Sequence, residues 1–281
     1  MQVGADSKFT HESVISKFIW ATQHVANKLT CSIKGSLLGN KITAYWFARI
    51  ANCGDLITPL LLKEYGFTPV HSSIKRAQVL STGSIFGWAP EDNSGNIVGS
   101  GLMKDTVHHF RKAKIWAVRG ELTRQRIDAP KDVVLGDPGL LASRLLKKMQ
   151  SKRYTLGIIP HFIDKKDPRI AKIKKKYEND VLIIDVIRQP LAVFEDIEQC
   201  EFILSSSLHG IIFADSFGIP NAWIYLSDKV VGEGFKFYDY CSAIGTCLKP
   251  LHLDGNESLS ELLKHPRQQP AAIEEVKERL D

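Results

Sequence analysis

Short apolar runs alternate along this chain with stretches that have the length and spacing of helices. The runs with strand character are residues 42–47, 77–83, 96–101, 114–120, 132–137, 154–160, 180–186, 201–207 and 221–226. Helix-like stretches occur at 55–66, 121–127, 138–149, 168–179, 190–199 and 209–218. Strands separated by helices of this size indicate βαβ units, so we expect an α/β protein with mostly parallel sheets.

The runs at 154–159 and 181–185 are apolar almost throughout, which is typical of parallel strands covered on both faces. A polar, basic stretch at 147–153 interrupts the alternation, and a fresh strand follows it. We therefore predict two Rossmann-like domains, residues 1–150 and residues 151–281. An extra amphipathic helix from Glu12 to Lys28 leads the first domain, and a helical tail at 257–280 ends the second.

The composition is that of a folded protein, with 44% hydrophobic and 24% charged residues in a chain of 281. No apolar run approaches the roughly 18 residues of a membrane-spanning helix, and the N-terminal stretch lacks the basic-then-apolar order of a secretory signal. Five cysteines are scattered, with no C-x-x-C pair among them. These features favour a cytoplasmic protein with reduced thiols, and argue against a disulfide scaffold or a zinc site.

The net charge is +6, and much of the basic excess lies between Lys147 and Lys176. One interpretation is a solvated helix face. The other is attraction to an anionic surface: either the inner membrane, which would make the protein peripheral to it, or a lipid-linked substrate. No nucleic-acid-binding motif accompanies the patch, so we expect no nucleic-acid partner.

The stretch SSSLHGIIFADSFGIP, residues 205–220, is the strongest candidate for a ligand site. It joins an apolar strand to a helix-like segment that closes with the helix-stop pattern G-x-P. Parallel sheets bind ligands beyond the carboxyl ends of their strands, and a helix N-terminus attracts anions through its unpaired amides and its dipole. This turn therefore predicts a phosphate or carboxylate site at Ser205, Ser206, Ser207, Leu208 and His209.

Other polar turns also follow predicted strands. In the first of them Asp55 either caps the next helix or lines, with Asn52, a loop that a substrate approaches closely. Small residues at two further strand ends leave room for a ligand: Gly83, Ser84, Gly99 and Ser100. None of these turns is a G-x-G-x-x-G loop, so no nicotinamide or flavin cofactor is expected.

Two more strand ends carry basic residues. Arg119 leaves an apolar strand just before a helix, where a guanidinium is either salt-bridged within the fold or presents its planar fork to a phosphate or carboxylate. His161 follows the proline that ends another buried strand. Two histidines, one arginine and a helix N-terminus facing one cleft would suit a small, multiply charged anion.

Taken together, N-x-G-D, a glycine-serine strand end, V-R-G-x-x-T, D-P, and S-S-S-L-H-G with its G-x-P resemble the polysaccharide pyruvyltransferase family, and most closely its branch that pyruvylates bacterial exopolysaccharides. The similarity covers roughly residues 45–226, and its last motif is the most specific. The resemblance implies a two-domain fold like that of GT-B glycosyltransferases, with phosphoenolpyruvate in the cleft. It also implies transfer of the pyruvyl group onto two sugar hydroxyls, which forms a cyclic ketal and releases phosphate.

The resemblance also implies roles for individual residues. His209 matches the family's active-site histidine, and Leu208 matches the residue before it. Many relatives carry arginine where this chain has Ser207, so amides and hydroxyls would bind part of the phosphate here, with Arg119 as the remaining basic anchor and His161 as a weaker one. The implied partners are phosphoenolpyruvate and a saccharide acceptor, free or lipid-linked. Nothing in this chemistry requires a cofactor or a metal ion.

Two other functions stay open at this point. A GT-B glycosyltransferase that uses a nucleotide sugar would share the fold and the cleft, and Asp228 or Glu233 is near enough in sequence to contact a ribose. A non-catalytic sugar-binding partner in polysaccharide assembly gains support from Ser207. Phosphate release from phosphoenolpyruvate, set against nucleotide release from nucleotide sugars, distinguishes the three.

Overall fold

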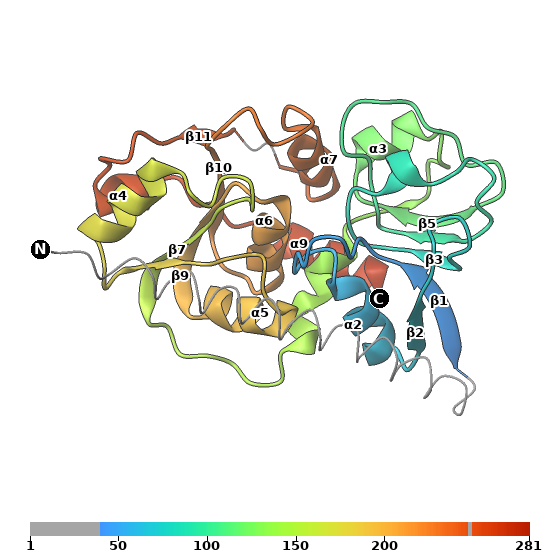
Figure 1. Ribbon diagram of the computed structural model, residues 1–281, viewed down its shortest axis with the longest axis horizontal. Coiled ribbons are helices and arrows are strands. Elements are labelled where there is room, and N and C mark those ends of the chain that lie inside the picture. Colours follow the sequence, from blue (N-terminus) through green and yellow to red (C-terminus); the bar gives the residue numbers. More distant parts are fainter. Residues whose placement is uncertain (1–39, 247–248) are drawn as a thin grey trace, which may run out of the picture.

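The computed structural model describes residues 40–246 and 249–281. The helix predicted from Glu12 to Lys28 lies outside the described residues. Figure 1 shows two sheets lying side by side, one built from the first half of the chain and one from the second.

Every strand pair in both sheets is parallel. The first sheet has six strands in the order β2-β1-β3-β4-β5-β6. They are β1 (Lys41–Tyr45), β2 (Thr68–His71), β3 (Val79–Leu80), β4 (Asn96–Val98), β5 (Lys114–Val118) and β6 (Val134–Leu135). The second sheet has five strands in the order β11-β10-β9-β7-β8. They are β7 (Tyr154–Ile159), β8 (Val181–Ile183), β9 (Cys200–Ser205), β10 (Asn221–Tyr225) and β11 (Leu251–His252).

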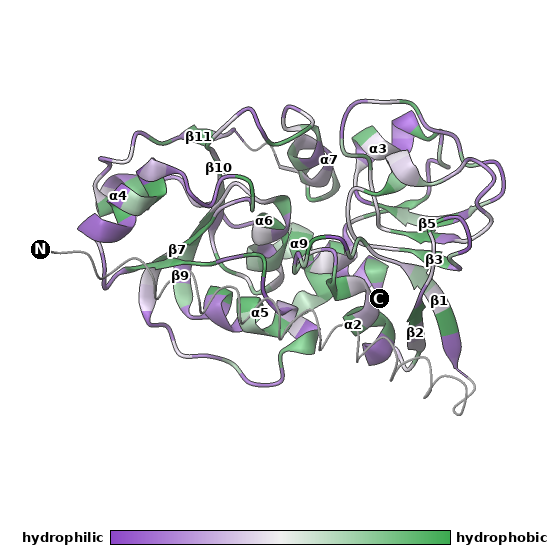
Figure 2. Cartoon of the chain, viewed as in Figure 1, coloured by the Kyte–Doolittle hydropathy of each residue, from purple (hydrophilic) through white to green (hydrophobic). Residues whose placement is uncertain are grey.

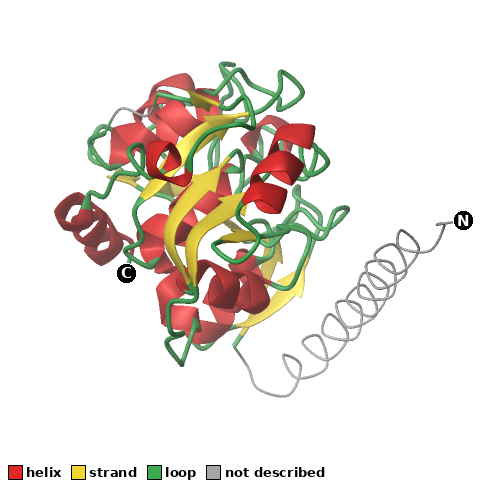
Figure 3. Ribbon diagram, turned by 90° about the vertical axis from the view of Figure 1, so that its left-hand side faces the viewer, coloured by secondary structure: helices red, strands yellow, loops and turns green. Residues whose placement is uncertain are grey.

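Helices cover these sheets, and Figure 3 shows them on both sides of the strands. The α-helices are α2 (Ile57–Glu64), α3 (Glu121–Arg126), α4 (Pro168–Lys176), α5 (Pro190–Glu198), α6 (Leu208–Ser216), α7 (Phe235–Ala243), α8 (Leu259–Leu262) and α9 (Pro270–Leu280). Two 3₁₀ helices are η1 (Phe86–Trp88) and η2 (Pro138–Leu145). The α/β class with two parallel, Rossmann-like sheets is thereby confirmed, whereas the domain boundary near residue 150 stays a prediction.

Several elements differ from the sequence-based expectation, and among them the short strand β11 and the 3₁₀ helix η1 were not predicted. The segment 138–149 was expected to be an α-helix, but only 138–145 is helical and it is a 3₁₀ helix, capped by the Asp137 side chain, which accepts from the Gly139 amide. Strand β2 was not predicted because it contains Pro69, which usually argues against a strand and is tolerated here at the sheet edge. Helix α7 was not predicted either, since it follows a glycine-rich loop and alternates aromatic with polar residues.

The two halves pack directly against each other. Ile57 and Leu61 of α2 belong to the same apolar cluster as Phe194 of α5 and Phe213 of α6. In Figure 2 the elements between the two sheets carry many hydrophobic residues, while α4 on the outside has both hydrophilic and hydrophobic ones. Among the described residues, no helix combines the length and the apolar character that crossing a bilayer would take.

The last helix, α9, returns from the second sheet to the first, as Figure 1 shows. The Nζ of Lys277 donates to the carbonyl of Ser216, and the Tyr65 hydroxyl donates to the Asp281 carboxylate at 2.6 Å. The tail therefore fixes the relative position of the two sheets below the cleft between them.

Candidate functional site

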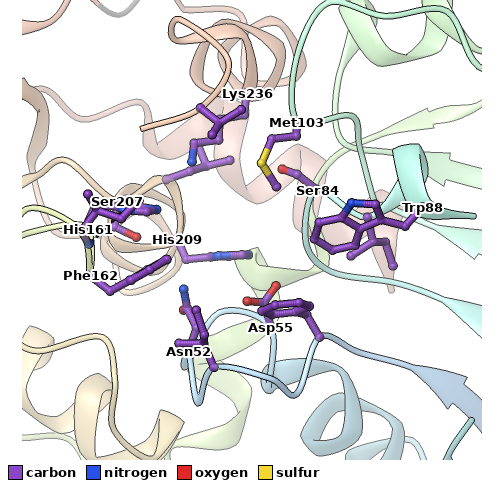
Figure 4. A pocket seen from close by; sticks show the side chains of 16 residues that line it. Asn52, Asp55, Ser84, Trp88, Met103, His161, Phe162, Ser207, His209 and Lys236 are labelled. Carbon is purple, nitrogen blue, oxygen red and sulfur yellow. Dashed lines mark hydrogen bonds between the residues drawn. The ribbon is translucent and has the colours of Figure 1, made fainter. Parts of the chain in front are cut away.

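A cavity of about 230 Å³ lies between the two sheets, and Figure 4 shows it from close by. Its lining comes from loops that follow β1, β3, β4, β7, β9 and β10, and so from the carboxyl ends of strands in both sheets. That is where open parallel sheets bind ligands. The lining residues are Phe47, Ile50, Asn52, Asp55, Ser84, Ile85, Trp88, Met103, His161, Phe162, Ile163, Ser207, Leu208, His209, Val231 and Lys236.

The serine-rich turn after β9 is held by its own hydroxyls. Ser205 Oγ donates to the carbonyl of Ile159 at 2.9 Å and accepts from the Ser207 amide at 3.0 Å. Ser206 Oγ accepts from the His161 amide at 2.8 Å, which ties this turn to the one after β7. Ser205 and Ser206 are therefore used within the fold, and neither lines the cavity.

Ser207 and the first turn of α6 are the parts of this motif that reach the cavity. Ser207 is the N-cap of α6, and its side chain caps no amide of the helix. The amides of Leu208 and His209 stand at the first positions of the helix, where no intrahelical acceptor exists. Together with the helix dipole, they make the expected anion-attracting end.

His209 projects from that first turn into the centre of the cavity (Figure 4). Its ring stacks on Phe213 with centroids 5.6 Å apart, and its Nε2 is buried with no hydrogen-bond partner among the described residues. Burial lowers the pKa of His209 to about 3, with further lowering by Lys236, Arg119 and His161. The imidazole is consequently neutral at neutral pH.

His161 lines the same cavity from the turn after β7, and Figure 4 shows it beside Phe162 and Ser207. Burial and the nearby Lys236 lower its pKa to about 4. Both histidines predicted from sequence therefore meet in one cavity as neutral rings.

Lys236 is a charged residue of the cavity that was not predicted from the sequence. It lies in the first turn of α7 with 9% of its surface exposed, and it lines the cavity with both histidines. Burial lowers its pKa to about 8, and no described residue forms a salt bridge or hydrogen bond with its ammonium group. No local sequence signal marks it, because its burial depends on where α7 packs against the other half of the molecule.

Asp55 lies opposite, in the loop between β1 and α2. The N-cap of α2 is Leu56 and no side chain caps this helix, so the interpretation of Asp55 as a helix cap is wrong. Its carboxyl group points into the cavity (Figure 4), and burial raises its pKa to about 7, an effect that Lys236 opposes and Asp137 enhances. Asn52 lies next to it, and its Oδ1 accepts from the Gly54 amide at 3.0 Å.

The sequence left two arrangements open for Arg119, a salt bridge within the fold or a contact with a phosphate or carboxylate. In the structure Arg119 forms a salt bridge within the fold. Its side chain is 0% exposed, and its Nε donates to Asp239 at 2.9 Å. One Nη donates to Ser84 Oγ at 2.6 Å and the other to the carbonyl of Leu102 at 2.5 Å. The guanidinium thus faces protein groups and does not line the cavity, which differs from the expectation that it anchors a phosphate.

Of the two glycine-serine strand ends, one contributes to the cavity lining and the other does not. Ser84 lines the cavity, next to Gly83, whose φ of +100° makes the sharp turn after β3. Ser100 is buried and donates to the Gly83 carbonyl at 2.8 Å, and Gly99 lies against Pro138. These two shape the loops behind the cavity without lining it.

The predicted site residues therefore fall into two groups. Those that line the cavity are Asn52, Asp55, Ser84, His161, Ser207, Leu208 and His209. Those that lie behind it are Gly83, Gly99, Ser100, Arg119, Ser205 and Ser206. The roles of all of them in binding or catalysis stay predictions.

The cavity is chemically divided. Lys236 and His161 lie on one side and Trp88 lies on the other, while His209 lies between them, against the loop that carries Asn52 and Asp55. Within residues 40–246 and 249–281, no group of three or more His, Cys, Asp or Glu side chains is placed to hold a metal ion. Such a cavity can hold a small anion at its cationic side and present a proton acceptor beside it.

The chain is similar in sequence to a described protein family and to two individual proteins. Residues 75–228 match the family described as Polysaccharide pyruvyl transferase, which is more than half of the chain. The uncharacterized protein L143 of Acanthamoeba polyphaga mimivirus is 36% identical over 159 residues, covering 53% of this chain and 54% of that protein. The chain thus spans about half the length of this relative.

The succinoglycan biosynthesis protein ExoV of Rhizobium meliloti (strain 1021) is 23% identical over 231 residues, covering 79% of this chain and 71% of that protein. No solved structure matches the chain.

Proposed function

The chain belongs to the polysaccharide pyruvyl transferase family, and we propose that it transfers the pyruvyl group of phosphoenolpyruvate to a sugar of a polysaccharide or of its lipid-linked precursor. The product is a cyclic pyruvate ketal, and phosphate is released. The observation that carries the proposal is the convergence of Lys236, two histidines and the N-terminus of α6 on one cavity.

The charge of this cavity suits the donor. Phosphoenolpyruvate carries a phosphate and a carboxylate, so its site needs two or so localised positive centres. Lys236 supplies one, and the amides that begin α6 supply the other. Lys236 thereby provides the positive charge that Ser207, in place of an arginine, does not.

The reaction needs proton transfer but no covalent enzyme intermediate. The methylene carbon of phosphoenolpyruvate gains a proton, and a sugar hydroxyl oxygen bonds to the neighbouring carbon as it loses its own. Phosphate then leaves with the electron pair of its carbon–oxygen bond, and a second hydroxyl oxygen takes its place. The proton of the second hydroxyl goes to the departing phosphate, so that one phosphate and one ketal account for all atoms.

His209 is the natural residue for the first proton transfer. At neutral pH the ring is neutral, so one of its nitrogens is free to accept the hydroxyl proton. The negative charges of bound phosphoenolpyruvate would favour the protonated ring and so oppose the lowering of its pKa. The imidazolium so formed can deliver that proton to the methylene carbon. Acid–base assistance of this kind typically contributes about 10²–10⁴-fold to a rate.

The glycosyltransferase alternative receives less support from the same geometry. Asp228 accepts a hydrogen bond from the Tyr225 hydroxyl, and neither Asp228 nor Glu233 lines the cavity. The two acidic residues that the sequence offered for a nucleotide ribose are therefore not part of this cavity, whose acidic lining residue is Asp55.

A thermal-shift titration with phosphoenolpyruvate tests the proposal. A ligand that binds only the native state increases the free energy of unfolding, by about 2.7 kcal/mol at a hundredfold excess over Kd, and so raises the melting temperature. We expect a saturable rise for the wild type, its loss in His209→Ala, and its retention in the exposed control His109→Ala. Phosphate release in the presence of acceptor sugars should follow the same order.

Two results would count against the proposal. Absence of any shift with phosphoenolpyruvate, together with a shift by nucleotide sugars, would favour the glycosyltransferase. A His209→Ala protein that melts many degrees below the wild type would show that this histidine supports the fold, and His209→Gln would then be the variant to compare.

A further inference from the structure

Two aromatic side chains stand at the side of the cavity away from the cationic groups. Phe47, in the loop after β1, contacts Trp88, in η1, with ring centroids 5.4 Å apart and an interplanar angle of 33°. Trp88 is 49% exposed although it is a large apolar side chain, and it lines the cavity. Figure 4 shows its ring across the cavity from His161 and Phe162.

An exposed tryptophan beside a cavity leaves apolar area for a ligand to cover. The Trp88 Nε1–H makes no hydrogen bond with any described residue, so it can donate to a ligand. On the loop that also carries Phe47, neither the NH₂ group of Asn52 nor the carboxyl group of Asp55 forms a side-chain hydrogen bond with any described residue. An apolar platform thus has one amide donor and one carboxylate acceptor at its edge.

This combination fits a pyranose ring. A pyranose presents one face of C–H groups, which packs on an aromatic ring, and an edge of hydroxyls, which bind carboxylate and amide groups. A second anion is disfavoured here, because Asp55 carries negative charge whenever it is ionised. The cationic side of the cavity serves the anion, and the aromatic side serves a neutral sugar.

We infer that Phe47 and Trp88, with Asn52 and Asp55 at their edge, form the subsite that holds the acceptor pyranose. The inference rests on the proposed function for its donor and adds the place and the recognition of the acceptor. In this position the sugar lies between Trp88 and His209, so its hydroxyls face both the imidazole and the Asp55 carboxylate.

The test uses a panel of methyl hexopyranosides, which carry no aromatic group of their own. Their binding to the full chain is measured by saturation-transfer NMR, with and without phosphoenolpyruvate. We expect Trp88→Ala to weaken glycoside binding by about tenfold, as loss of one ring contact and its buried area would give. Trp88→Phe should recover most of it, and phosphoenolpyruvate affinity should change by less than about twofold.

Trp116→Ala is the matched control, because Trp116 is 50% exposed and lies on β5, outside the cavity. Equal glycoside binding by Trp88→Ala and Trp116→Ala would overturn the subsite, as would a wild type that binds none of the panel. Failure of the donor proposal looks different. In that case phosphoenolpyruvate causes no thermal shift, while glycoside binding still depends on Trp88.

Discussion

Lys236 shows at the scale of one residue how the site is maintained at a cost to the fold. Its pKa is lowered to about 8 by burial. At neutral pH the folded protein therefore keeps a charged ammonium group in a low-dielectric environment, which costs free energy of folding. The unfolded lysine titrates near its ordinary value. The cost is therefore present below pH 8 and fades as pH rises from the folded pKa toward the unfolded one.

We expect Lys236→Met to raise the free energy of unfolding at neutral pH, on the order of 1–3 kcal/mol, because it removes this cost. The same variant should show no thermal shift with phosphoenolpyruvate. Urea unfolding measures the first effect, and the exposed Lys229→Met is the control that should change neither. A less stable Lys236→Met protein would contradict this account.

The pH dependence of donor binding follows from the same ammonium group. Affinity for phosphoenolpyruvate should fall as pH rises through about 8, where Lys236 loses its proton. Ionisation of Asp55, with its pKa near 7, adds repulsion in the same direction. Calorimetric titrations above about pH 7, where the phosphate charge is constant, measure this dependence. An affinity that is flat or rises across this range would exclude Lys236 as the donor's counter-ion.

We expect the loss of the Arg119 side chain to reduce stability, unlike the loss of the His209 or Lys236 side chain. Removing one partner of a buried ion pair leaves the other charge uncompensated, which typically costs about 3–5 kcal/mol. In Arg119→Ala the carboxylate of Asp239 would be left in this state, because both side chains are 0% exposed. We expect a large loss of stability in urea unfolding. A variant with wild-type stability and weakened phosphoenolpyruvate binding would instead return Arg119 to the site.

At the scale of elements, the cavity depends on the close approach of two loops from different sheets. The Cys53 amide donates to the Val186 carbonyl at 2.9 Å, which joins the loop after β1 to the segment after β8. Gly54, next in the chain, lies so close to His209 that a Cβ at this position would overlap the imidazole ring. The loop after β1 thus sets the position of the ring in α6.

Gly54→Ala should therefore displace the His209 ring and reduce phosphate release by about 10²-fold or more, the typical worth of a positioned acid–base group. Some loss of stability should accompany this effect, because the overlap reaches Nδ1, Cγ and Cε1 of a ring that stacks on Phe213, and urea unfolding measures it. Gly87→Ala is the control, since a Cβ there meets nothing. Equal rates for the two variants would mean that the loop does not position the histidine.

The strands and helices show which parts of the fold could be predicted from the sequence. Every strand expected from an apolar run is present, because parallel strands covered on both faces have a strong local signal. The turn before His209 was predicted for the same reason, as a strand end followed by a helix start. Lys236 and the pairing of Arg119 with Asp239 could not be predicted, since they arise where α7 of one half lies on α3 of the other. No local pattern encodes that contact.

At the scale of the whole molecule, Asp239 joins the two halves beside the cavity. From α7 it accepts hydrogen bonds from Arg119, from the Thr123 amide at 2.7 Å and from the Thr123 hydroxyl at 2.6 Å. On the other side α9 packs Val276 and Leu280 against Gly136. Contacts on both sides join the two halves, so we expect the proposed donor and acceptor subsites to keep a fixed separation.

The basic segment around α4 lies far from these contacts, on the outside of the second half (Figure 1). Its lysines are not equivalent. Lys174 Nζ donates to the carbonyls of Glu178 and Val181, and Lys176 Nζ donates to those of Asn256 and Glu257. These two support the local fold and are unsuitable for a test of surface charge. The exposed lysines without such bonds are Lys166, Lys172 and Lys175.

If this face meets an anionic membrane that carries a lipid-linked acceptor, those three lysines supply the attraction, at about 1 kcal/mol each near the surface. Replacing all three with glutamine should then weaken sedimentation with phosphatidylglycerol-containing vesicles by roughly two orders of magnitude at low salt. The matched control replaces the exposed Lys75, Lys112 and Lys131 of the first half, which changes the net charge equally. Equal losses in the two triple variants would reflect overall charge alone, and unaltered binding in both would leave α4 as a solvated helix face.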